Sequence, residues 1–278
     1  MSKNQLTKRE GFSNYVSKVV NDRCATFLSE PEQRERLTKL VMGLVPKNPK
    51  ILECTPTSVA MCLLHCAELG LEPSTTTGHA WLIPRWSKQA GSQELTFLVG
   101  YKGFLELAHR VGNVRTIYAG VVYDGEDFTI SIDPSGVSIR HVPSLARDFD
   151  RSDDALVASY VIVTTHDGGT YSEWCTRDEI DQRRKAGGSR RFSPWSTHFP
   201  RMARKCAIRK LFAGGAVPMT GQAAHQLRKA VEVDIEAELR DMREAREPTP
   251  PPPLTLLEGD SDSDPEPMPG LFADGGEE

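Results

Sequence analysis

Residues 193–212 read SPWSTHFPRMARKCAIRKLF, a segment with five Arg or Lys residues, aromatic residues at both ends and no Asp or Glu. At about 100° per residue, a helix over this segment gathers six apolar side chains on one side: Phe199, Met202, Ala203, Cys206, Ala207 and Leu211. The opposite side carries four basic residues: Arg201, Arg204, Lys205 and Arg209. An apolar stripe of this kind docks a helix on another layer. We therefore expect the helix to pack on a sheet and to display its basic side.

A few residues of the segment do not fit this two-sided pattern. Lys210 falls within the apolar side, where we expect it to extend its ammonium to solvent or to pair inside the protein. Ile208 and Phe212 fall among the basic residues and are expected to be buried against another element or subunit. Trp195 and the preceding Phe192 are predicted to anchor the core or a loop rather than to stack on bases.

Helix and strand patterns alternate along the chain before this segment. Residues 12–45 predict one or two amphipathic helices, broken near Ser29–Pro31, and Thr55 predicts the N-cap of a further helix that Gly70 ends. The next predicted elements are a hairpin at 79–84 and 95–99, a helix at 100–112, a meander over 115–142, a hairpin over 156–175, and helices at 176–185 and 200–212. This order predicts an α+β fold, with N-terminal helices, a central antiparallel β-meander with an inserted helix, a C-terminal basic helix and a disordered acidic tail.

The charge is divided between a basic body and an acidic tail. Fifteen acidic residues and three arginines lie from Glu232 onward, a net charge of -12, so the first 231 residues carry +8 in a chain whose formal net charge is -4. Ten basic residues and no acidic one lie within residues 183–210: Arg183, Arg184, Lys185, Arg190, Arg191, Arg201, Arg204, Lys205, Arg209 and Lys210. Like charges repel one another unless a polyanion neutralises them, which favours nucleic acid as the partner over a merely solvated basic face.

Motifs for catalysis are missing from the sequence. It has no GxxxxGK[ST] loop for a nucleoside triphosphate, no GxGxxG, no HExxH, no GxSxG and no Glu-x-Lys pair of a metal-dependent nuclease. We therefore expect a protein that is not an enzyme and needs no cofactor. Gly100–Gly103 (GYKG) matches the GxxG pattern of a nucleic-acid clamp, although two glycines at a strand-to-helix junction are more often turn residues. Without a helix-turn-helix or finger motif, the basic residues favour a groove that follows a phosphate backbone.

The six cysteines and the hydropathy pattern indicate a reduced, cytoplasmic protein. Cys62, His65 and Cys66 share a helix face, but the sequence has no CxxC pair and no clear fourth ligand, so burial in the core is favoured over a zinc site. No apolar run approaches the ~18 residues that cross a membrane, and the N-terminus lacks the apolar stretch of a signal peptide. We expect no membrane partner.

Four blocks of the sequence, in this order and spacing, resemble the RecT family of phage-type single-strand DNA annealing recombinases: NPKILECTPTSVAMCLLHCAELGLEPS, GHAWLIP, VGYKGFLELAHRVG and PWSTHFPRMARKCAIRKLF. The resemblance covers roughly residues 48–218. It implies an α+β fold, ATP-independent binding of single-stranded DNA, annealing and exchange of strands in homologous recombination, and assembly into rings or helical filaments. The partners that it implies are a phage exonuclease and the host single-strand-binding protein, in a bacterial or phage-infected cell. We also expect Mg²⁺ to modulate annealing.

The family's basic helix maps onto Arg204, Lys205, Arg209 and Lys210. Where family members often carry acidic residues after the aromatic, this chain has Pro200 and Arg201, which leaves the role of Arg201 open. The residues that we predict to contact DNA are Tyr101, Lys102, Arg183, Arg184, Lys185, Arg190, Arg191, Arg201, Arg204, Lys205, Arg209 and Lys210. They would hold one strand extended while its bases test a second strand by pairing. Alanine at positions 204, 205 and 209 is then expected to abolish binding and leave the fold intact.

Four parts of the chain follow from these patterns: 1–47 as an N-terminal helical region and candidate oligomer contact, 48–221 as the RecT-like DNA-binding core, 222–247 as a charged C-terminal helix, and 248–278 as a Pro-rich linker with a disordered acidic tail. The tail either occupies the basic groove when DNA is absent, recruits a partner, or only keeps the protein in solution. Two alternatives stand beside annealing for the whole chain. One is a protective single-stranded DNA- or RNA-binding protein, and the other is a nuclease.

Overall fold

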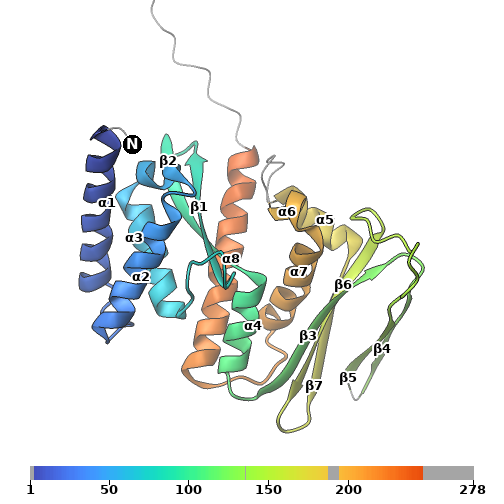
Figure 1. Ribbon diagram of the computed structural model, residues 1–278. Coiled ribbons are helices and arrows are strands. Elements are labelled where there is room, and N and C mark those ends of the chain that lie inside the picture. Colours follow the sequence, from blue (N-terminus) through green and yellow to red (C-terminus); the bar gives the residue numbers. More distant parts are fainter. Residues whose placement is uncertain (1–2, 135, 187–193, 247–278) are drawn as a thin grey trace, which may run out of the picture. The chain divides into compact units, whose positions relative to one another are not determined.

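A computed structural model of the chain describes residues 3–134, 136–186 and 194–246, all within one compact unit, residues 1–247 (Figure 1). The predicted linker and acidic tail, residues 248–278, lie outside the described residues, and so do Arg190, Arg191 and Phe192.

Helices form the N-terminal part of the chain: α1 (Lys3–Asp22), α2 (Pro31–Leu44), the short 3-10 helix η1 (Pro49–Glu53) and α3 (Pro56–Leu69). α1 packs against both α2 and α3 (Figure 1). The Thr55 hydroxyl caps α3 by accepting a hydrogen bond from the Ser58 N–H at 3.4 Å, and Gly70 ends the helix with a φ of 61°. Both helix boundaries are as predicted, because a cap and a left-handed glycine are local features.

Strands of the described residues pair in three antiparallel sheets. Their bounds are β1 (Ala80–Ser87), β2 (Ser92–Val99), β3 (Val114–Tyr123), β4 (Asp127–Asp133), β5 (Gly136–Val142), β6 (Leu156–Thr165) and β7 (Thr170–Thr176). β1 and β2 form a hairpin, β3, β6 and β7 form a three-stranded sheet in that order, and β4 and β5 form a second hairpin. Together with the helices these sheets confirm the α+β class.

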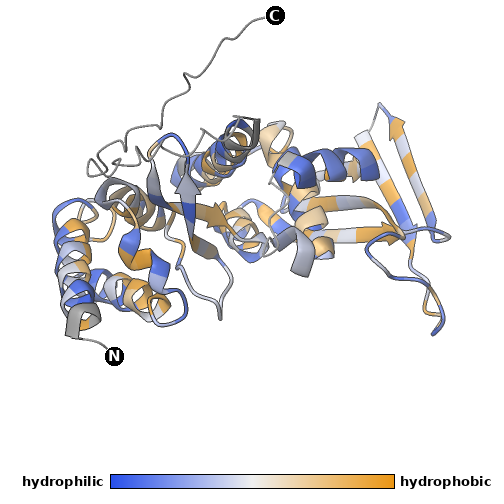
Figure 2. Cartoon of the chain, turned by 90° about the horizontal axis from the view of Figure 1, so that it is seen from above, coloured by the Kyte–Doolittle hydropathy of each residue, from blue (hydrophilic) through white to orange (hydrophobic). Residues whose placement is uncertain are grey.

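The strand pairing differs from a meander of consecutive strands. β3 pairs with β6, with Gly120 opposite Tyr160, and the β4–β5 hairpin is an insertion between them. β3 and β6 each bury long runs of residues, whereas β4 and β5 alternate between half-buried and exposed positions. Figure 2 shows hydrophobic and hydrophilic residues alternating along the strand pair at its right. A hairpin with one apolar face covers the outside of a sheet more favourably than it joins its interior.

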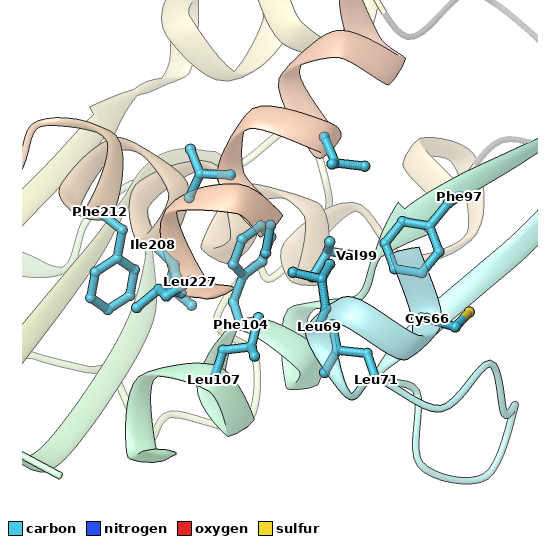
Figure 3. Close-up of a cluster of buried hydrophobic side chains, with 14 of the residues drawn as sticks. Cys66, Leu69, Leu71, Phe97, Val99, Phe104, Leu107, Ile208, Phe212 and Leu227 are labelled. Atoms are coloured by element: carbon cyan, nitrogen blue, oxygen red, sulfur yellow. The ribbon is translucent and has the colours of Figure 1, made fainter. Parts of the chain in front are cut away.

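The remaining helices are α4 (Tyr101–Arg110), α5 (Arg177–Ala186), α6 (Pro194–Thr197), α7 (Phe199–Ala213) and α8 (Gly221–Arg246). α7 packs on β3, β6 and β7, as predicted, and also contacts α4 and α8. Ile208 and Phe212 are 0% and 2% exposed and lie beside Phe104, Leu107 and Leu227 (Figure 3). The predicted burial of Ile208 and Phe212 is therefore confirmed, and helices of the same chain cover both side chains.

Two cations of α7 lie in the interior, and α8 supplies their partners. Lys205 Nζ donates to Asp234 Oδ1 at 2.6 Å, and Arg209 Nη1 donates to Asp234 Oδ2 at 3.1 Å. Arg209 also pairs with Glu238. The side chains of Lys205, Arg209 and Asp234 are 10%, 9% and 2% exposed. We name Lys205, Arg209, Asp234 and Glu238 the α7–α8 ion cluster.

The α7–α8 ion cluster corrects the expectation that Lys205 and Arg209 are displayed. A helical wheel places them opposite the side that docks on the sheet, but α8 covers that opposite side. Alanine at positions 205 and 209 would leave Asp234 buried without a counter-charge, so we now expect such a variant to lose stability.

Replacing Asp234 by Ala should lower the free energy of unfolding by about 3–5 kcal/mol, because the buried Lys205 loses its counter-charge and Arg209 loses one of its two carboxylate partners. Urea denaturation measures the change. Glu232→Ala, at an exposed position of the same helix, is the control and should change stability by about 0.5 kcal/mol or less. Equal losses in the two variants would contradict a stabilising role for the α7–α8 ion cluster.

Candidate nucleic-acid interface

Lys210 is half-buried and pairs with groups of the same chain, which confirms one of the two outcomes expected from the helical wheel. Its Nζ donates to Glu179 Oε1 and to the Trp174 carbonyl oxygen, each at 2.9 Å, and lies 3.4 Å from Glu173 Oε1. Burial alone would lower the pKa of Lys210, but the hydrogen bond and charge of Glu179 outweigh it and raise that pKa. Lys210 therefore fastens α7 to β7 and α5. Contact with DNA by Lys210, Lys205 or Arg209 stays a prediction.

The basic residues of α5 occupy its last turn, where the helix dipole favours positive charge. Arg183 Nη1 donates to the Cys206 carbonyl oxygen at 3.5 Å. The Arg184 guanidinium lies 5.1 Å from the centre of the Phe199 ring, and Lys185 is exposed. None of the three forms an ion pair with another described residue, so their charge is available to a partner.

Arg201 and Arg204 lie one turn apart on α7 and therefore share a face of that helix. Arg201 is exposed, whereas Arg204 is half-buried. The Nε atom of Arg204 is buried and has no hydrogen-bond partner, and neither arginine forms an ion pair with another described residue. A guanidinium without a counter-charge beside the core is costly unless a ligand supplies one.

The charge of Arg204 acts on three tyrosines from other elements. Burial raises the pKa of Tyr101, Tyr123 and Tyr160, and the nearby Arg204 guanidinium opposes that rise in each case. Tyr101 is also within electrostatic range of Tyr118. These electrostatic effects indicate that Tyr101 lies near both Arg204 and Tyr118. DNA contact by Tyr101 and Arg204 stays a prediction.

The GYKG motif is a packing feature at the start of α4. A Cβ atom at Gly100 would lie 2.0 Å from the Gly78 carbonyl oxygen, and one at Gly103 would lie 2.1 Å from the His79 carbonyl oxygen. Only glycine permits so close an approach of two backbones. The two glycines are therefore explained by the close packing of α4 on the chain that precedes β1.

Lys102 and Trp81 flank that contact on the outside of the protein. A Cβ atom at Gly78 would lie 3.7 Å from Lys102 Cδ and 3.9 Å from Trp81 Cζ2, so both side chains border this glycine. Lys102 is exposed and forms no ion pair with another described residue, and the Trp81 side chain remains 39% exposed. A cation beside an exposed aromatic ring suits a phosphate and a neighbouring base.

We define the candidate DNA-binding surface by six residues: Trp81, Tyr101, Lys102, Tyr118, Arg201 and Arg204. Trp81 and Tyr118, the latter 61% exposed, were not singled out from the sequence. Exposed aromatic residues in strands next to a basic segment are the pattern that would have pointed to them.

Cys62, His65 and Cys66 share a face of α3, where Cys62 Sγ donates to the Leu95 carbonyl oxygen at 3.3 Å. Burial raises the pKa of both thiols and lowers that of His65. A thiol with a raised pKa resists the deprotonation that metal ligation needs. The described part of the chain contains no cluster of three metal-ligating side chains, and none of its helices has the length and apolar character of a membrane span.

Comparisons with known proteins agree with the resemblance seen in the sequence. The sequence model of the RecT family matches residues 35–250, a range that includes the whole candidate DNA-binding surface. Protein RecT of Escherichia coli (strain K12) is 29% identical over 227 residues, which cover 76% of this chain and 82% of that protein. The uncharacterized protein YqaK of Bacillus subtilis (strain 168) is 22% identical over 179 residues, which cover 64% of this chain and 58% of that protein.

Replacing Lys210 by Met should make part of the protein's stability independent of pH. Burial alone would raise the pKa of Glu179, but the hydrogen bonds from Lys210 and the Thr176 N–H lower it overall. A lowered carboxyl pKa contributes stability above the unfolded pKa, which is lost as the pH falls through the folded pKa. The raised pKa of Lys210 preserves the pair at alkaline pH until the folded pKa is passed.

Urea denaturation across pH tests this prediction. The difference in unfolding free energy between wild type and Lys210→Met should be constant near neutrality and shrink below about pH 4.3. Lys39→Met, which removes an exposed pair with Glu35, should show little difference at any pH. A wild-type advantage over Lys210→Met that persists unchanged in acid would reject the pair's contribution.

Proposed function

The chain belongs to the RecT family, since the family model matches residues 35–250, and we propose that it binds single-stranded DNA and anneals complementary strands without ATP. Membership makes it a recombination protein of the phage type. Annealing, strand exchange and independence of ATP are parts of the proposal. The 29% identity to Protein RecT of Escherichia coli over 76% of the chain supports the same proposal.

The observation that carries the proposal is the unpaired charge on the candidate DNA-binding surface. Lys102, Arg201 and Arg204 have no ion-pair partner among the described residues, while Lys205, Arg209 and Lys210 all have one. Tyrosines and Trp81 lie among the unpaired cations. Cations alternating with aromatic rings suit a strand whose phosphates and bases are both accessible, which is a single strand rather than a duplex.

Two roles follow for the basic residues of α7. Arg201 and Arg204, with Lys102 from α4, would neutralise phosphates and hold the strand extended. Lys205 and Arg209 would hold α7 against α8 through the α7–α8 ion cluster. The side chains of Arg183, Arg184 and Lys185 extend the positive charge at the end of α5 and would add further phosphate contacts. Base pairing with a second strand, and no chemical step by the protein, would supply sequence specificity.

Annealing over many nucleotides requires several copies of such a surface. We propose that the chain assembles into rings or helical filaments, in which weak contacts from successive subunits add through effective concentration. We further propose that it acts beside a phage exonuclease and the host single-strand-binding protein, and that Mg²⁺ modulates annealing.

Mixing complementary labelled strands with the protein, in the absence of ATP, tests the proposed activity. We expect duplex formation to be accelerated over the protein-free rate, and the DNA to stay intact with added Mg²⁺. Binding without acceleration would favour the protective single-strand-binding alternative, and loss of labelled DNA would favour a nuclease. Either result would reject annealing as the function.

Replacing Arg204 or Lys102 by Ala should weaken binding to an oligonucleotide and make its salt dependence shallower. Each phosphate contact to a single strand contributes about -0.7 to the slope of log affinity against log salt, so each variant should lose about that amount. Fluorescence anisotropy at several salt concentrations measures both quantities. Arg23→Ala, at an exposed position outside the candidate DNA-binding surface, is the matched control. An Arg204 variant with the wild-type slope would remove Arg204 from the interface.

A further inference from the structure

Two lysines from distant parts of the chain meet on the turn of residues 74–78, which leads from α3 into β1. The last N–H of this turn donates to its first carbonyl oxygen at 2.9 Å and closes it. Lys47 Nζ donates to Thr75 Oγ1 at 2.9 Å. Lys102 reaches the other end of the turn, where a Cβ atom at Gly78 would lie 3.7 Å from Lys102 Cδ. We name residues 74–78 the α3–β1 turn.

The surroundings of the α3–β1 turn favour a negatively charged ligand. Lys47 and Lys102 are exposed, and neither forms an ion pair with another described residue. Lys102 belongs to the first turn of α4, which holds no acidic residue. The N–H groups and the dipole at the start of a helix add to the attraction of a phosphate. The exposed hydroxyls of Thr75 and Thr76 offer further hydrogen-bond donors.

The Trp81 ring lies against the α3–β1 turn because two glycines leave room for it. A Cβ atom at Gly100 would lie 3.1 Å from Trp81 Nε1, and one at Gly78 would lie 3.9 Å from Trp81 Cζ2. Both atoms belong to one edge of the indole, so that edge packs on glycine backbone. Gly78 has a φ of 67°, a conformation that favours glycine. Trp81 nevertheless remains 39% exposed, so part of its ring stays open to a ligand.

The strand β1 holds Trp81 in this position. Trp81 pairs with Leu98 of β2, and its neighbours Ala80 and Leu82 are 1% and 7% exposed. Its backbone is therefore fixed by the sheet and by the core beneath it. A ring that is already ordered loses less conformational entropy when a ligand binds.

We infer that the α3–β1 turn is a nucleotide-binding subsite, in which the Trp81 ring stacks on a base and Lys102 and Lys47 bind phosphates of the same strand. Aromatic rings hold bases by their faces, whereas ammonium groups attract the backbone. The inference rests on the proposed binding of single-stranded DNA and extends the candidate DNA-binding surface to Lys47 and the α3–β1 turn.

Stacking on Trp81 suits the proposed annealing for two reasons. A base inside a duplex is covered on both faces by its neighbours, so the Trp81 ring selects an unpaired strand. Stacking engages the face of the base and leaves its pairing edge free. A strand held on Trp81 can therefore still test a second strand by pairing.

Anisotropy titrations with two oligonucleotides of equal length, an oligothymidylate and an abasic strand of the same backbone, separate stacking from phosphate contact. Trp81→Leu, which keeps an apolar side chain on the glycines, should weaken oligothymidylate binding about fivefold or more. Abasic-strand binding and the salt slope should not change. Trp86→Leu is the matched control, because Trp86 is 54% exposed on the same strand and an odd number of residues away, on the opposite face. It should bind both strands as the wild type does.

Indole fluorescence repeats the stacking test in a variant that keeps an aromatic ring. Oligothymidylate should quench the emission of the wild type, and the abasic strand should not. Trp81→Phe should bind oligothymidylate more tightly than Trp81→Leu does, because a phenyl ring still stacks, but most of the quenching should be lost with the indole.

Lys47→Met tests the phosphate contact and should weaken binding to both strands. The slope of log affinity against log salt should become shallower by about 0.7. Lys18→Met, at an exposed position of α1, is the control and should keep the wild-type slope.

Wild-type affinity in Trp81→Leu, equal losses on both strands, or full quenching in Trp81→Phe would overturn the stacking role of Trp81. A wild-type salt slope in Lys47→Met would overturn the phosphate contact by Lys47. A wild-type protein that binds neither strand would instead reject the proposed function itself.

Discussion

Asp234 neutralises two cations in the interior of the protein, and the placement of α7 depends on that neutralisation. α7 lies between the three-stranded sheet on one side and α4 and α8 on the others, so a helix with five basic residues is almost enclosed. Lys205 and Arg209 could not be buried there without the carboxylates of α8. Because α8 must approach closely to supply them, its own apolar residues, such as Leu227, complete the core around Phe104 and Phe212 (Figure 3).

The basic residues of α7 fall into two groups with different roles, because α7 is enclosed on most of its sides. Lys205, Arg209 and Lys210 face α8, β7 and α5, form ion pairs within the chain and hold the helix in place. Arg201 and Arg204 face no described carboxylate and retain their charge for a ligand. A basic helix that looks uniform in composition is therefore a structural element on one side and a binding surface on the other. Mutations on the two sides should be distinguishable, since one class alters stability and the other alters DNA affinity and its salt dependence.

The inserted β4–β5 hairpin is tied to the three-stranded sheet through one side chain of β6. His141 of the hairpin contacts Tyr160, whose ring crosses Gly120 of β3. A ring can cross the strand there because a Cβ atom at position 120 would lie 2.5 Å from it. The departure from consecutive strand pairing therefore brings the hairpin against the side chain that lies over β3.

Local sequence patterns and motif order determined the family, the α+β class, the Thr55 and Gly70 helix boundaries and the apolar docking side of α7. Each depends on residues close together in the chain, where capping, glycine conformation and helical periodicity act directly. The tertiary structure alone decided which cations are exposed and that β3 pairs with β6. A helical wheel gives the two sides of a helix but not the distant segment that covers each side. Asp234 lies beyond the basic segment in sequence, and only the folded chain shows that Lys205 and Arg209 form buried ion pairs with it.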